Sequence, residues 1–159
     1  MNQLLLIIDV QNAFNPPPWL VEGLQQLTPH LLSVATVERY DESKTPFGRQ
    51  LGWTPPVHDE CLVKVDHVFI KHGYAPTPEI MQFLQSLQPD RVLVAGIQTD
   101  TCCLAAGFAL FDAGLTPTLL TDLTVGSSLD RSGQLGINLW KHHFGNVATS
   151  QQVLQEIGP

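Results

Sequence analysis

Charged residues, cysteines and long apolar runs are all scarce in this sequence. Only 8 of its 159 residues are Lys or Arg and the formal net charge is −7, so no basic stripe is available for a phosphate backbone. The first apolar stretch stops at Asp9 and no other apolar stretch approaches the length of a membrane-spanning helix, which needs about 18 apolar residues. We therefore expect no nucleic acid and no membrane as a partner, and favour a small-molecule substrate.

The cysteines and the low charge also bear on compartment and assembly. Cys61, Cys102 and Cys103 form no spaced disulfide framework, and the amino terminus lacks a basic segment followed by an apolar stretch, so we expect a cytoplasmic protein. Charged residues make up 14% of the chain, below the roughly 25% usual for soluble domains, which predicts that a second copy covers part of the surface. The length suits one domain over residues 1–159, and we expect a homo-oligomer of it.

Strand and helix patterns alternate along the chain without a linker or an internal repeat. A continuous apolar run, typical of a strand buried on both faces, predicts a strand over residues 3–10, and the Val- and Thr-rich residues 33–40 predict a second. Further strands are predicted over residues 61–70, 91–96 and 116–120 and near Val147. Helical spacing predicts a short helix ended by Pro29, one opened by Pro78, two over residues 101–113 and 129–143, and one from Ser150. This order predicts an α/β fold of three layers, α/β/α, with a mostly parallel six-stranded sheet and helices on both faces.

Three of these strands lead into a reactive side chain: Asp9, Lys71 and, after a short turn, Cys102. The carboxyl ends of parallel strands meet at one edge of the sheet, where open α/β sheets bind ligands. Taken singly, each residue has a structural explanation, as a turn Asp, a surface Lys or a small core Cys. Together they predict an active site in which Lys71 keeps Asp9 ionised and able to accept a proton.

The turn before Cys102 places this thiol at a helix amino terminus, where the pKa of a thiol is usually depressed, so we expect a thiolate. Spacing alone leaves open whether Cys102 or Cys103 faces the pocket. Their adjacency also allows a redox interpretation, although a disulfide between neighbouring residues is strained. The polar loop over residues 41–60 is long for a simple connection, and we expect it to cover the pocket or reach a neighbouring subunit.

Residues 5–14, 69–74, 94–102 and 109–122 carry a family resemblance. They are similar to the isochorismatase-like cysteine hydrolases, a group that includes nicotinamidases and N-carbamoylsarcosine amidohydrolases. The resemblance spans most of the chain, and its first three fragments stand in the same order at strand ends. It implies the isochorismatase-like, Rossmann-like fold and hydrolysis of a small molecule.

The resemblance also implies roles for individual residues. Asp9, Lys71 and Cys102 match the family's catalytic Asp-Lys-Cys triad, which leaves Cys103 as a packing residue. A cis peptide is expected between Ile97 and Gln98, and the backbone N–H groups of Gln98 and Cys102 are expected to form the oxyanion hole. Phe14 matches a position that lines the active site in this family.

Two further aromatic residues, Trp53 and Tyr74, are candidate walls of the substrate pocket, although ordinary core or interface positions explain them equally well. Nicotinamidases carry a metal-binding Asp-x-His after the second strand, where this chain has the segment 38–41, Glu-Arg-Tyr-Asp. We therefore expect no metal and no cofactor.

The sequence hypothesis is a cysteine hydrolase that cleaves an amide-like C–N bond through a thioester intermediate. Three alternatives remain: an isochorismatase-type ether hydrolase, a non-catalytic binding module of the same fold, and a thiol sensor using Cys102 and Cys103. The retained Cys102 favours C–N chemistry.

Overall fold

The computed structural model describes residues 1–159 and contains one six-stranded sheet in which all strands run parallel. The strand order is β3-β2-β1-β4-β5-β6. The strands are β1 Gln3–Ile8, β2 Leu32–Glu38, β3 His67–Lys71, β4 Arg91–Ile97, β5 Pro117–Val125 and β6 Val147–Ala148. The predicted α/β class with a parallel six-stranded sheet is confirmed.

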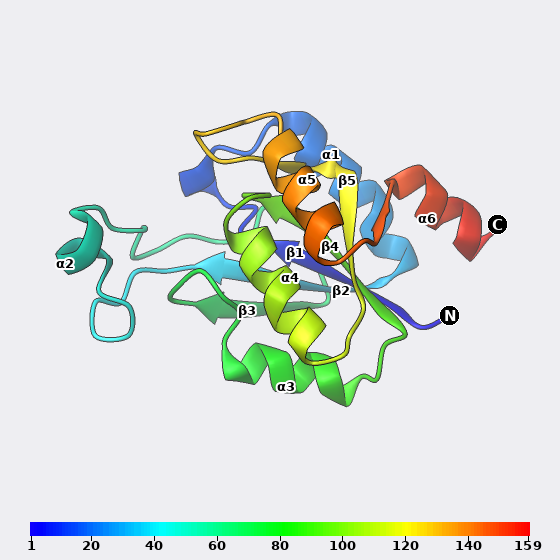
Figure 1. Cartoon of the computed structure of the whole chain (residues 1–159), viewed down its shortest axis with the longest axis horizontal. Helices are drawn as coiled ribbons and strands as arrows, with labels where there is room; N and C mark the ends of the chain where they lie inside the picture. The colour runs from blue at the N-terminus through cyan, green and yellow to red at the C-terminus, as the bar shows by residue number, and fades with distance from the viewer.

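Helices cover both faces of this sheet (Figure 1). The α-helices are α1 Pro18–Leu27, α2 Phe47–Leu51, α3 Pro78–Ser86, α4 Cys102–Asp112, α5 Gln134–His143 and α6 Ser150–Ile157, and the 3-10 helices are η1 Asn12–Phe14 and η2 Thr28–His30. Buried residues of α1 and α6 form one hydrophobic cluster with the sheet. Those of α3, α4 and α5 form a second cluster on the opposite face. The layers are therefore α/β/α.

The central strand β1 shows why the sequence forms this sheet. Leu5 and Ile7 pack into the first cluster, whereas Leu4, Leu6 and Ile8 pack into the second. Successive side chains of a strand point to opposite faces, so a strand covered on both sides must be apolar throughout. The run ends at the strand's carboxyl end, and Asp9 is the first residue beyond it.

Several predicted boundaries are wrong by a few residues or more. The third strand begins at His67, not at residue 61, because Cys61 forms only an isolated antiparallel bridge with Gln11. The fifth strand extends to Val125, past a register irregularity in its pairing with β4. The helix predicted over residues 129–143 begins at Gln134 because the Asp130 carboxylate accepts hydrogen bonds from backbone N–H groups of the preceding turn and first helical turn.

The long loop predicted over residues 41–60 contains the short helix α2, which lies at the far end of an excursion from the sheet (Figure 1). Glycine is required at one point of the sheet edge. Gly96 has a φ of +117°, and a Cβ there would lie 2.2 Å from the Ile8 carbonyl oxygen. The missing side chain of Gly96 lets β4 lie close to β1 at Ile8, immediately before Asp9 on one strand and Ile97 on the other. None of the helices combines the length and the apolar character that a membrane-spanning segment needs.

Candidate active site

The carboxyl ends of β1 and β3 and the start of α4 bring three predicted residues together at one edge of the sheet. Lys71 Nζ lies 2.9 Å from Asp9 Oδ2, and the Cys102 thiol is within hydrogen-bonding reach of the Asp9 carboxylate. Both Asp9 and Lys71 are almost completely buried. Cys102 is partly exposed at the first position of α4. The structure thus assembles acid, amine and thiol from three elements.

Asp9 is aimed by an uncommon backbone conformation. Its φ is +53°, in the left-handed region, which costs most residues about 1–3 kcal/mol and often occurs at active sites. The Thr36 hydroxyl donates a hydrogen bond to Asp9 Oδ1 at 2.8 Å. The Oδ2 contact with Lys71 is an ion pair without hydrogen-bond alignment, so Oδ2 is the oxygen available to accept a proton.

Glu38 is the third charged residue of this cluster and was not among the predicted site residues. It is the last residue of β2, and its register partner in β3 is Lys71. Glu38 Oε2 lies 2.7 Å from Lys71 Nζ. Like Asp9, Glu38 is an acidic residue at the carboxyl end of a buried strand. The same pattern, an acidic residue that closes a strand, could have identified it from the sequence.

Burial dominates the electrostatics of these carboxylates. It raises the pKa of Asp9, an effect that the Lys71 charge only partly offsets. It also raises the pKa of Glu38 to about 7, again against the pull of Lys71 and with a further rise from Asp9. Burial lowers the pKa of Lys71, but the negative charges around it outweigh burial, and the net pKa is raised. Lys71 therefore stays an ammonium.

The prediction of a depressed Cys102 pKa is wrong. Burial raises the pKa of this thiol to about 12, and the Asp9 charge adds to the rise, whereas Lys71 opposes it. A helix amino terminus is worth only about 0.3–1 kcal/mol at an exposed site, less than the cost of placing a thiolate beside a buried carboxylate. The resting nucleophile is therefore a neutral thiol close to Asp9.

The turn before α4 leaves two backbone donors free. The peptide bond between Ile97 and Gln98 is cis. The N–H groups of Thr101 and Cys103 both donate to the Gln98 carbonyl, at 3.0 and 3.1 Å, whereas those of Gln98 and Cys102 donate to no backbone acceptor. Cys103 is fully buried in the core cluster beneath α4, so Cys102 is the cysteine that faces the pocket.

A cavity of about 320 Å³ opens at Cys102, a volume at the lower end for sites that hold small ligands. Of the predicted residues, it is lined by Phe14, Trp53, Tyr74, Gln98 and Cys102. Asp9 and Lys71 do not line it and lie behind its wall. Sequence reasoning missed the other lining residues, which are Glu38, Phe47, Pro55, Gly73 and Thr101.

Phe47 organises the aromatic side of this cavity. Its buried ring packs edge-on against Trp53 and Tyr74, with centroids 5.8 and 5.6 Å away. Trp53 and Tyr74 are about half exposed, at 51% and 47%. The 41–60 loop therefore supplies part of the pocket wall. No sequence periodicity marks Phe47, because its ring packs against Trp53 from later in the same loop and against Tyr74 from beyond β3.

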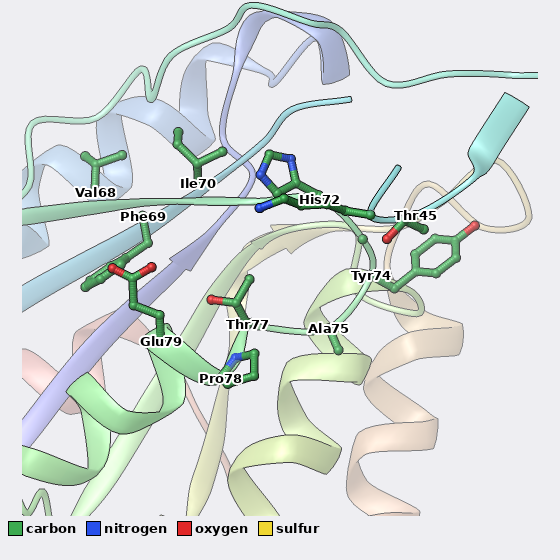
Figure 2. A pocket seen from close by; sticks show the side chains of 12 residues that line it. Thr45, Val68, Phe69, Ile70, His72, Tyr74, Ala75, Thr77, Pro78 and Glu79 are labelled. Atoms are coloured by element: carbon green, nitrogen blue, oxygen red, sulfur yellow. The ribbon is translucent and has the colours of Figure 1, made fainter. Parts of the chain in front are cut away.

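A larger hollow of about 890 Å³ follows the edge strand β3 and the turn that leads into α3. Figure 2 shows the side chains that line it, among them His72, Thr77 and Glu79. It shares Gly73 and Tyr74 with the smaller cavity but includes no cysteine. The smaller cavity is therefore the candidate active site.

No group of three or more His, Cys, Asp or Glu residues is arranged to hold a metal ion. Residues 38–41 stand where nicotinamidases carry the metal-binding Asp-x-His motif. The position of the motif's histidine is occupied by Tyr40, whose hydroxyl donates a hydrogen bond to Glu42 at 2.6 Å.

Comparisons with known proteins agree with this architecture. Residues 3–152 match the isochorismatase domain family. No curated protein matches the sequence significantly. A cysteine hydrolase from Pseudomonas syringae pv. phaseolicola 1448A superposes with a TM-score of 0.78 at 16% identity, over 98% of this chain and 92% of that chain.

Two amidases have the same fold. The N-carbamoylsarcosine amidase of Thermoplasma acidophilum superposes with a TM-score of 0.78 at 17% identity, over 94% of this chain and 97% of that one. The pyrazinamidase of Pyrococcus horikoshii, solved in complex with zinc, gives 0.77 at 18% identity, over 94% and 99%. With a family match across nearly its whole length, this chain belongs to the isochorismatase domain family.

Proposed function

We propose that this protein is a cysteine hydrolase that cleaves an amide-like C–N bond of a small molecule through a thioester on Cys102. The observation that carries the proposal is that buried Asp9 lies against both Lys71 and Cys102, and that Cys102 lines a small cavity. Membership of the family supports it, as does the fold shared with two amidases.

In the first half of the reaction, Asp9 removes the thiol proton as Cys102 Sγ attacks the substrate carbonyl carbon. The raised pKa of Cys102 fits this order, because proton transfer then accompanies attack. The free N–H groups of Gln98 and Cys102 hold the oxyanion, and one such donor is typically worth about 3 kcal/mol. Protonated Asp9 passes its proton to the nitrogen as the C–N bond breaks.

In the second half, Asp9 takes a proton from water, which attacks the thioester carbonyl. The C–S bond breaks, the acid leaves, and Asp9 returns the proton to the Cys102 sulfur. Lys71 keeps Asp9 in place and favours its ionised form, while burial makes that carboxylate a stronger base than one in water. The scheme consumes one water and regenerates every group.

The decisive experiment screens small amides, carbamoyl compounds and hydroxamates for ammonia or amine release. On a confirmed substrate, Cys102→Ala should lose activity by at least about a thousandfold, and the wild type should show a thioester adduct in the mass spectrum after rapid quenching. Cys103→Ala is the matched control and should keep its activity, since Cys103 is buried in the core. Undiminished turnover by Cys102→Ala would rule the scheme out.

The thiol-sensor alternative has less support. A redox-sensing cysteine is usually accessible and has a low pKa, whereas Cys103 is fully buried and the pKa of both adjacent thiols is raised.

A further inference from the structure

The turn over residues 98–101, which leads to the free N–H groups of the site, is held from one side by the end of β5. The Thr99 N–H donates to the Val125 carbonyl at 2.9 Å. The hydroxyl groups of Thr99 and Thr124 share a hydrogen bond of 2.6 Å, and both residues are buried. The second residue of the turn is therefore fixed through its backbone and through its side chain.

Asp100 makes the next contact with the same part of the chain. Its Oδ1 accepts a hydrogen bond from the Ser127 N–H at 2.8 Å, and its Oδ2 accepts one from the Ser127 hydroxyl at 2.6 Å. Both residues are only partly exposed. One serine of the connection between β5 and α5 thus engages both oxygens of this carboxylate.

Helix α5 closes the turn from behind. A Cβ at Gly136, in the first turn of α5, would lie 2.6 Å from the Asp100 backbone nitrogen and 2.6 Å from the Thr99 carbonyl carbon. These are backbone atoms, which cannot swing aside as a side chain can. The absent side chain of Gly136 lets the helix lie directly against the turn. The turn is thereby enclosed by β5, the connection after it and α5.

Ser127 also determines what the Asp100 carboxylate leaves free. Acidic side chains close to a helix amino terminus are attracted to its unpaired N–H groups. The amino terminus of α4 has no side-chain cap at its N-cap residue Thr101, and Asp100 gives both of its oxygens to Ser127. The Cys102 N–H therefore remains available to a ligand.

We propose that Asp100 and Ser127 are the positioning pair of the oxyanion hole. They hold the turn so that its two free N–H groups meet at one point of the cavity, and they keep the Asp100 carboxylate away from that point. The inference rests on the proposed hydrolase function and deepens it. Neither residue lines the cavity, so the pair acts through the turn. Donors that are already in place need no rearrangement when negative charge develops on the substrate oxygen.

The substitution Ser127→Ala removes one bond of the pair and leaves one carboxylate oxygen free, whereas Ser127→Thr keeps the hydroxyl. The chain offers a matched control in Ser150→Ala. At the start of α6, the Ser150 N–H and hydroxyl donate to the two oxygens of Asp122 in the same pattern, and neither residue lines the cavity. A loss shared by both alanine variants is the structural cost of the bond.

Turnover of a confirmed substrate provides the first measurement. Ser127→Ala should lower kcat by at least about tenfold and leave KM within about twofold, because the oxyanion exists only after the attack on the carbonyl. Ser127→Thr should restore kcat to within about threefold of wild type. Ser150→Ala should keep the wild-type kcat and KM.

Aldehydes test the same pair without any turnover. In an aldehyde adduct the Cys102 sulfur bonds to the carbonyl carbon, the thiol proton goes to Asp9 and the carbonyl electron pair goes to the oxygen, while no group leaves. Carbon NMR with carbonyl-labelled benzaldehyde, furan-2-carbaldehyde and propanal measures the affinity of this adduct. Iodoacetamide alkylates the same sulfur with loss of iodide and forms no oxyanion. Ser127→Ala should weaken the adduct by at least about tenfold and leave the alkylation rate within about twofold.

The two measurements separate this proposal from the proposed function. If no amide is cleaved but Ser127→Ala selectively weakens the wild-type aldehyde adduct, the positioning pair holds and the hydrolase proposal fails. If amides are cleaved equally well by Ser127→Ala and wild type, the hydrolase proposal stands and the pair is refuted. Equal losses in Ser127→Ala and Ser150→Ala, a parallel change in alkylation, or no adduct with any of the three aldehydes also overturns the pair.

Discussion

The buried Glu38 carboxyl should make the protein less stable as the pH rises from 5 to 8. Its pKa rises from an ordinary value of 4.5 to about 7 in the folded protein. Between these values the folded state holds a proton that the unfolded chain has released. The free energy of unfolding therefore falls with increasing pH in this window, because the folded state binds more protons there.

The size of the effect follows from the same two values. Each pKa unit corresponds to about 1.4 kcal/mol, so a rise from 4.5 to about 7 represents roughly 3 kcal/mol in all. About 2–3 kcal/mol of it falls between pH 5 and 8. Asp9 acts in the same direction, since burial raises its pKa as well.

Other acids of the protein act below this window. Asp41, Glu42, Asp59 and Asp130 have a lowered pKa, through hydrogen bonds that outweigh desolvation. Their stabilisation is present above the unfolded-state pKa of about 4 and is lost as the pH falls through the folded value. A decline above pH 5 therefore cannot come from them.

Urea unfolding followed by tryptophan fluorescence, with buried Trp140 as the core reporter, measures the profile at half-unit steps. Glu38→Gln lacks the titrating group, so its stability relative to wild type should improve by about 2–3 kcal/mol between pH 5 and 8. Glu60→Gln, an exposed site, should follow the wild type. A pH-independent difference between Glu38→Gln and wild type would refute the reasoning.

Three further substitutions test the frame of the site. Lys71→Met leaves two buried carboxylates without a cation and should destabilise the protein by about 3–5 kcal/mol at pH 8, less at pH 5; an equal loss at both pH values in denaturant titrations would contradict this. Asp59→Ala removes the carboxylate that accepts hydrogen bonds from the backbone N–H groups of Asn12 and Ala13. The adjacent Phe14, which lines the cavity, then loses its support, so KM should rise more than kcat falls. An unchanged KM would argue against Phe14 as part of the substrate-binding wall. Gly96→Ala should cost about 2 kcal/mol or more in unfolding free energy, since its Cβ would meet the neighbouring strand; wild-type stability would show that the edge can relax.

Asp9, Lys71 and Cys102 could be found from the sequence because their positions depend on a simple rule. Each follows or ends an apolar run, and parallel strands end at a common edge. Glu38 obeys the same rule but closes a run that contains Ser and Thr, so the end of that strand was harder to see. Phe47 follows no rule of this kind, since its burial is created by Trp53 and Tyr74.

The acidity of Cys102 was predicted with the wrong sign for a related reason. Its place at a helix amino terminus is local and can be read from the sequence. Its burial beside Asp9 depends on how β1 and α4 meet in the fold, and this larger effect decides the direction. Local sequence thus gave the identity of the reactive group, whereas the fold determines its protonation state.

Stability alone does not explain this cluster. A buried ion pair is often no better than a well-packed apolar replacement, and here two carboxylates surround one ammonium, so one negative charge is not balanced. Asp9 adds a left-handed backbone conformation, and Glu38 adds a buried oxygen without a partner. The unbalanced charge, the strained backbone of Asp9 and the unpartnered Glu38 oxygen all belong to residues in direct contact with Lys71, next to the cavity that Cys102 lines. Unfavourable features concentrated at a single edge are expected of a site built to react, because the proposed reaction uses the raised basicity of Asp9.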